Sequence, residues 1–151
     1  MDVNLKEIAA AMEDNRLYAE FYLNKSDGKV TRISRDILDA VEDDDPESVP
    51  DMAKNAAQIA EAIMFDPKCT MIQVPNLSFA EQLRLMTTFY TQVKDKELSK
   101  KLEAMRKSRN PTLRLLEALK DYPDEMKKWN DYKESFYVEE ASKWVKSLSL
   151  N

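Results

Sequence analysis

The stretch from Asn110 to Val145, NPTLRLLEALKDYPDEMKKWNDYKESFYVEEASKWV, contains both tryptophans of the chain. Its apolar side chains recur every three or four residues, which is the period of an amphipathic helix. Pro123 interrupts the pattern, because proline lacks the amide hydrogen that a helix interior needs. The stretch therefore predicts two helices. The first helix is expected to run from Thr112 to Tyr122 and to bury Leu113, Leu116 and Leu119. The second helix is expected to begin at Asp124 and to bury Met126, Trp129, Phe136, Ala141, Trp144 and Leu148.

Capping residues mark further helix starts upstream. Asn4 stands three residues before Glu7, and Ser78 stands three residues before Glu81, a spacing that allows reciprocal capping of the first turn. Ser34 is expected to begin a short helix, and Pro50-Asp51 another that ends at Asp66-Pro67. The helix after Ser78 is expected to bury Phe79, Leu83, Met86, Phe89, Tyr90 and Val93, and a helix over residues 95–109 to bury Leu98, Leu102 and Met105.

A β-hairpin is predicted in the N-terminal half. Residues 17–23, LYAEFYL, and 29–33, KVTRI, have strand composition, and Asp27-Gly28 between them is typical of a hairpin turn. Residues 70–74, TMIQV, predict a third strand, since a two-stranded hairpin alone is marginal in water. The expected fold is α+β, with this small antiparallel sheet packed against about six helices and a helical C-terminal half, in a single domain over residues 1–151.

Composition excludes several chemistries. The chain has no histidine, which excludes Ser-His-Asp and Cys-His catalysis, and a single glycine, which excludes glycine-rich nucleotide-binding loops.

No apolar run approaches the roughly 20 residues that span a bilayer, and the acidic N-terminus does not resemble a signal peptide, so we expect a cytoplasmic protein without membrane contact. We expect no cofactor and no metal; the acidic run from Glu42 to Glu47 lacks the EF-hand pattern and predicts a solvated loop. Cys69, in an apolar run, is predicted to be a buried structural thiol.

Charge is unevenly distributed along the chain, whose net charge is −5. Residues 1–75 contain 16 acidic and 8 basic side chains, whereas residues 94–120 contain 9 basic and 4 acidic ones. The basic segment from Lys100 to Arg114 holds the candidate anion- or ligand-binding residues Lys101, Arg106, Lys107, Arg109 and Arg114. The helix starting at Pro111 offers backbone amides to an anion, and arginine suits phosphate. The alternative is a solvated, charged helix face.

Two other groups have competing interpretations. Trp129, Tyr132 and Phe136 are candidates for stacking on nucleic-acid bases, but Trp129, Phe136 and Trp144 share one helix face and are predicted to be core. Glu20 lies between Ala19 and Phe21 in a predicted strand and is expected to face solvent rather than to act as a catalytic acid.

Several elements together resemble a known family. They are Tyr22-Leu23 with Asp27-Gly28 and Val30, Pro75 after the third strand, Trp129 with Tyr132 and Lys133, and Ala141 with Trp144. The order of these elements is similar to the bacterial uncharacterised protein family 0158 of the UPF series, over nearly the whole chain. The family usually has a Gly-Ala-Phe-like stretch after its basic Ser-Arg element, whereas Asn110-Pro111-Thr112 follows Ser108-Arg109 here. The resemblance implies a fold and a bacterial cytoplasmic setting, and no reaction.

Three functions remain open on these grounds. The first is a non-enzymatic binding or adaptor protein with a protein partner, and it is favoured because the catalytic motifs above are missing. The second is binding of nucleic acid or a phosphate ligand through Lys100 to Arg114, although a net charge of −5 is untypical of nucleic-acid binders. The third is a carboxylate-based enzyme, so whether the chain is an enzyme stays open, as does its oligomeric state.

Overall fold

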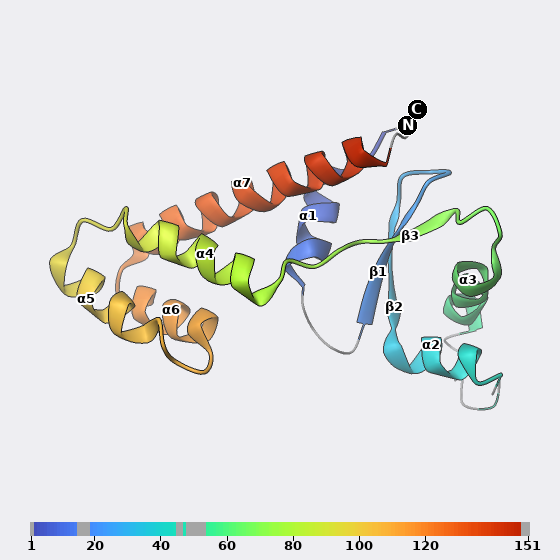
Figure 1. Cartoon of the computed structure of the whole chain (residues 1–151), viewed down its shortest axis with the longest axis horizontal. Coiled ribbons are helices and arrows are strands. Elements are labelled where there is room, and N and C mark those ends of the chain that lie inside the picture. The colour runs from blue at the N-terminus through green and yellow to red at the C-terminus, as the bar shows by residue number, and fades with distance from the viewer. Residues whose placement is uncertain (1, 15–18, 45–46, 48–53, 149–151) are drawn as a thin grey trace. The chain divides into compact units, whose positions relative to one another are not determined.

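The computed structural model describes residues 2–14, 19–44, 47 and 54–148, which contain seven α-helices and three β-strands (Figure 1). The helices are α1 (Leu5–Glu13), α2 (Arg35–Glu42), α3 (Lys54–Phe65), α4 (Phe79–Tyr90), α5 (Lys96–Met105), α6 (Pro111–Leu119) and α7 (Pro123–Ser147). The strands are β1 (Ala19–Asn24), β2 (Val30–Ser34) and β3 (Met71–Gln73). The α+β class with a helical C-terminal half is confirmed.

The chain groups into two compact units. Unit 1 comprises residues 1–76 and 138–151, and so contains the sheet, α1, α2, α3 and the last turns of α7. Unit 2 comprises residues 77–137, and so contains α4, α5, α6 and the first turns of α7. The single domain expected over residues 1–151 stays a prediction.

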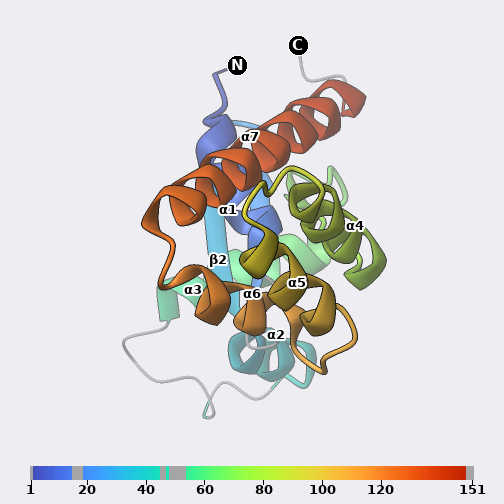
Figure 2. The ribbon, with the colours of Figure 1, turned by 90° about the vertical axis from the view of Figure 1, so that its left-hand side faces the viewer.

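The sheet of unit 1 has the strand order β2-β1-β3, with both pairs antiparallel. The third strand is therefore confirmed. Leu17 and Tyr18, which the sequence assigned to the first strand, lie outside the described residues. Figure 1 draws α1 on one side of the sheet and the pair α2 and α3 on the other, and Figure 2 shows α1 in front of β2 from the side.

Gly28 is required in the hairpin turn for two reasons. Its φ is +76°, a left-handed conformation that side chains with a Cβ rarely adopt. A Cβ at this position would also lie 2.4 Å from the backbone carbonyl oxygen of Asp2. The turn is closed by the Gly28 amide, which donates to the Asn24 carbonyl over 2.8 Å. The predicted hairpin is confirmed, and the N-terminal segment packs onto its turn.

The core of unit 1 forms where α2 and α3 cover one face of the sheet. Its buried members are Tyr22, Ile33, Leu38 and Ala60, one each from β1, β2, α2 and α3. The short helix predicted after Ser34 is confirmed, because the Ser34 hydroxyl accepts from the Ile37 amide at the start of α2. Helix α3 is likewise confirmed, although the start predicted for it at Pro50-Asp51 lies outside the described residues.

Helix α4 begins at the predicted capping residue Ser78, but two other details in unit 2 differ from the sequence expectation. Ser78 Oγ accepts from the Glu81 amide at the start of α4. Phe79, expected in the core, is 62% exposed. Helix α5 ends at Met105 rather than at Arg109, and residues 106–109 form a turn. Pro111 disfavours helical geometry in Asn110, whose φ of −132° and ψ of 79° lie outside the helical region.

Helix α7 begins at Pro123, so the proline that separates the last two helices is itself the first residue of the second. Trp129, Tyr137 and Ala141 are buried. Four residues that were expected to be buried are only partly so: Met126, Phe136, Trp144 and Leu148. Among the described residues, no helix combines the length and apolarity that crossing a bilayer requires.

Candidate functional site

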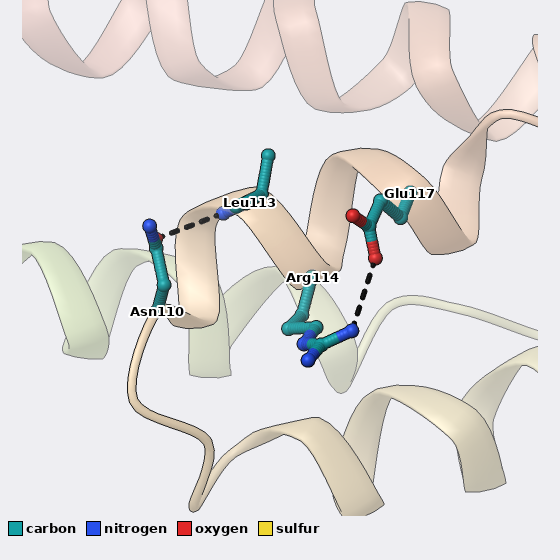
Figure 3. Close-up of polar contacts among 4 residues, drawn as sticks. All are labelled: Asn110, Leu113, Arg114 and Glu117. Atoms are coloured by element: carbon teal, nitrogen blue, oxygen red, sulfur yellow. Dashed lines mark hydrogen bonds and ion pairs between the residues drawn. The ribbon is translucent and has the colours of Figure 1, made fainter.

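The turn between α5 and α6 carries most of the basic residues predicted to form a site. Asn110 caps α6, and its Oδ1 accepts from the Leu113 amide over 3.2 Å (Figure 3). Pro111 follows as the first residue of the helix, where its missing amide hydrogen costs nothing. The Ser108 amide donates to the Met105 carbonyl and so folds the turn back onto α5. These local bonds place Arg106, Lys107 and Arg109 in one exposed turn.

Two of the candidate arginines are engaged in surface ion pairs. Arg106 lies 3.5 Å from Glu103, and Arg114 lies 3.3 Å from Glu117, one helical turn away in each case (Figure 3). All four side chains are about half exposed. Exposed pairs of this kind contribute roughly 0–1 kcal/mol, so they neutralise local charge without rigidifying the surface.

The remaining candidates differ in their surroundings. Lys101 lies on α5 with its Nζ 6.0 Å from the centre of the Tyr122 ring, a cation–π arrangement. Lys107 and Arg109 are exposed and make no ion pair with any other described residue. The structure thus brings three of the five predicted residues into one turn and leaves Arg114 on α6 and Lys101 on α5.

The backbone at the start of α6 offers little to an anion. Pro111 has no amide hydrogen, the Leu113 amide donates to the Asn110 side chain, and the Arg114 amide donates to the Asn110 carbonyl. An anion at this helix start would therefore depend on the side chains of Lys107 and Arg109. That these residues form a ligand site stays a prediction.

The outward face of α6 carries exposed leucines, contrary to the sequence expectation. Leu113 is 50% exposed and Leu116 is 39% exposed, whereas Leu115 and Leu119 are fully buried. The predicted burial of the first two is therefore wrong. Leucines occupy both faces of this helix, so their spacing in the sequence does not indicate which face is buried. In Figure 3, Leu113 and Arg114 point to opposite sides of the helix.

Of the aromatic residues considered for base stacking, Trp129 is buried in unit 2, whereas Tyr132 and Phe136 are partly buried. Trp129 is 3% exposed, and its ring centre lies 5.2 Å from that of Phe89. Tyr132 stacks on the same Phe89 ring at 6.3 Å. Trp129 is thus core, as predicted, and the three rings pack on one another beneath the surface rather than presenting a platform to bases.

A family model described as Uncharacterised protein family (UPF0158) matches residues 2–151. The chain belongs to the uncharacterised protein family UPF0158. No curated protein and no solved structure matches it.

In this member of UPF0158, Glu20 does not face solvent as the sequence predicted. Its side chain is 16% exposed and lies 2.8 Å from the guanidinium of Arg35, the first residue of α2. The Tyr22 hydroxyl donates to the same carboxylate. Burial, followed by this hydrogen bond, raises the pKa of Tyr22 well above its ordinary value. Glu20 thus links β1 to α2. Within the described residues, no cluster of three or more acidic or thiol side chains is placed to hold a metal.

A shallow pocket of about 240 Å³ lies in unit 1 between the sheet and α3. It is lined by Asn24, Thr31, Ile59, Ala62, Asp66, Thr70 and Met71. This is smaller than typical small-molecule sites, which are about 300–1,000 Å³. Cys69, in the neighbouring turn, is exposed rather than buried, and its φ of +50° is a left-handed backbone conformation.

Proposed function

We propose that the protein is a non-enzymatic binding protein of the bacterial cytoplasm, and that it contacts a protein partner through the outward face of α6. One observation carries the proposal: Leu113 and Leu116 are exposed on a helix whose opposite face is already buried. The core of unit 2 does not need them, and apolar groups next to charged ones are typical of protein interfaces.

The segment that contains these leucines is mostly basic. Residues 107–120 contain four basic side chains and one acidic one, a net charge of +3. A protein partner suits this face better than a nucleic acid does, since Trp129 is buried and two of the nearby arginines already pair with glutamates. A carboxylate-based reaction has less support, because Glu20 is paired with Arg35.

The two leucines set the expected size of the effect. Fully burying a leucine stabilises a complex by about 2 kcal/mol, so covering the exposed parts of both contributes roughly 2 kcal/mol, or about thirtyfold in affinity. Replacing both with glutamine removes this contribution and leaves the helix able to form.

Affinity capture with three forms of the protein tests the proposal. The wild type, Leu113→Gln/Leu116→Gln and the control Phe79→Gln are immobilised at equal density and exposed to lysate of the source organism. Phe79 is a matched control because it is also an exposed apolar residue of unit 2 but lies on α4. We expect a protein that is retained by the wild type and the control and lost with the double variant. Equal recovery on all three forms, or recovery of nucleic acid in place of protein, would overturn the proposal.

A further inference from the structure

Two helical regions of the chain carry opposite charge. Residues 35–66, which include α2 and α3 of unit 1, contain ten acidic and two basic side chains, a net charge of −8. Residues 94–120, which include α5 and α6 of unit 2, contain nine basic and four acidic side chains, a net charge of +5. The chain's overall charge of −5 therefore conceals two segments with strong charge of opposite sign.

Each charged surface also exposes apolar groups. In unit 1, Phe65 at the end of α3 is 71% exposed, and Glu61, four residues earlier and on the same side of the helix, is exposed as well. In unit 2, Leu113 and Leu116 are exposed on α6. Each region thus exposes apolar side chains as well as charged ones, and the net charges of the two regions have opposite sign.

The charges on both sides are available for pairing with another molecule. Asp39 and Glu42 on α2 are exposed and make no ion pair with any other described residue. The same is true, within the described part of the chain, of Lys107 and Arg109 beside α6. Neither set is neutralised within its own unit, in contrast to Arg106 and Arg114.

We propose that the partner of the α6 face is a second copy of this chain, which presents its α2 and α3 surface. Phe65 of one copy then covers Leu113 and Leu116 of the other, and the acids of α2 face Lys107 and Arg109. The inference rests on the proposed function, since it names the partner of the same face. One phenylalanine and two leucines make a small apolar centre, so the association is weak and depends on salt.

Sedimentation velocity on the full chain tests the proposal. The protein is measured from about 10 to about 500 µM, in about 50 mM and about 500 mM salt, because screening at the higher salt shortens the reach of surface charges severalfold. We expect the weight-average sedimentation coefficient to rise with concentration at low salt and to rise much less at high salt. A concentration-independent monomer at low salt would overturn the proposal.

Substitutions beside and on α6 test one side of the contact. Lys107→Glu/Arg109→Glu and, separately, Leu113→Gln/Leu116→Gln are each expected to weaken self-association by about tenfold or more. The control Lys127→Glu/Lys128→Glu makes the same charge change at exposed positions on α7 and is expected to leave association unchanged. Equal effects of the two charge reversals would show a general response to net charge and would contradict the proposed contact.

A charge swap provides the decisive comparison. Asp39→Lys/Glu42→Lys reverses the acidic margin and places cations near the end of α2, where the helix dipole favours them. We expect this variant and Lys107→Glu/Arg109→Glu each to lose self-association, and their equimolar mixture to regain it. A mixture that stays monomeric would overturn the pairing of these two surfaces.

The inference and the proposed function fail in different ways. If the chain is monomeric but a different protein is captured in a manner that depends on Leu113 and Leu116, the α6 face binds a partner that is not a second copy. If neither self-association nor capture depends on these leucines, both proposals are wrong.

Discussion

Leu115 and Leu113, two positions apart on α6, should respond very differently to truncation. Leu115 is fully buried in unit 2, whereas Leu113 is 50% exposed on the opposite side of the helix. Each becomes alanine in a separate variant. Because the two substitutions remove the same atoms from the same helix, helix propensity and denatured-state effects largely cancel in the comparison.

The expected magnitudes follow from burial. A Leu→Ala change removes three carbon groups worth about 0.8 kcal/mol each when buried, so Leu115→Ala loses about 2.4 kcal/mol of transfer free energy, and the cavity raises the cost to about 3 kcal/mol. Leu113→Ala loses at most about half of the transfer term and leaves no cavity. The better helix propensity of alanine offsets part of this, so we expect a cost below about 1 kcal/mol.

Urea unfolding followed by circular dichroism and by tryptophan fluorescence measures both variants. Trp129 lies in the core of unit 2, so its fluorescence reports on the unit that contains α6. Equal destabilisation by the two variants would refute the assigned orientation of α6. A larger loss of stability from Leu113→Ala than from Leu115→Ala would refute this orientation more strongly. It would also refute the proposed binding face on α6.

Three further changes test other parts of the structure. Gly28→Ala should lower the free energy of unfolding by about 2 kcal/mol or more, because the left-handed φ and the clash with the Asp2 carbonyl act together; a urea midpoint equal to that of the wild type would contradict this account. Arg114→Gln should cost less than about 0.5 kcal/mol at low salt, since its ion pair is exposed, and a loss above about 1 kcal/mol would assign it a structural role. Burial raises the pKa of Tyr22 and Tyr90 above the ordinary value near 10, so both stay protonated in the folded state while the unfolded chain ionises. Stability should therefore fall as pH rises above about 10. Ultraviolet titration should show a late-ionising fraction that is smaller in Tyr22→Phe, and a titration curve without a late fraction would contradict both burials.

The candidate site was only partly accessible from the sequence. The pattern located the basic segment, because charge is read directly from neighbouring residues, whereas the cap at Asn110 is seen only in the structure. The pattern assigned Leu113 and Leu116 to the core, and the apolar half of the proposed surface was therefore missed. A helix with leucines on both faces offers no local reason to prefer either one.

The ion pair of Glu20 also could not be predicted from the sequence. Its partner Arg35 lies fifteen residues later, and the two meet because β2 runs antiparallel to β1 and delivers the start of α2 to this side of the sheet. An alternating strand pattern predicts a solvent-facing carboxylate, but it contains no information about which helix crosses above it.

By itself, the sequence determined several element boundaries. Asn4, Ser34 and Ser78 each cap the helix that follows, Pro123 separates the last two helices, and Gly28 forms the hairpin turn. These features depend on hydrogen bonds and backbone angles within a few residues, so local composition was sufficient. Only the tertiary structure decided which face of α6 is buried, that Glu20 meets Arg35, and that Cys69 is exposed. The physical reason is that burial is set by the surfaces brought against a residue from elsewhere in the chain, and those are fixed by packing rather than by sequence neighbours.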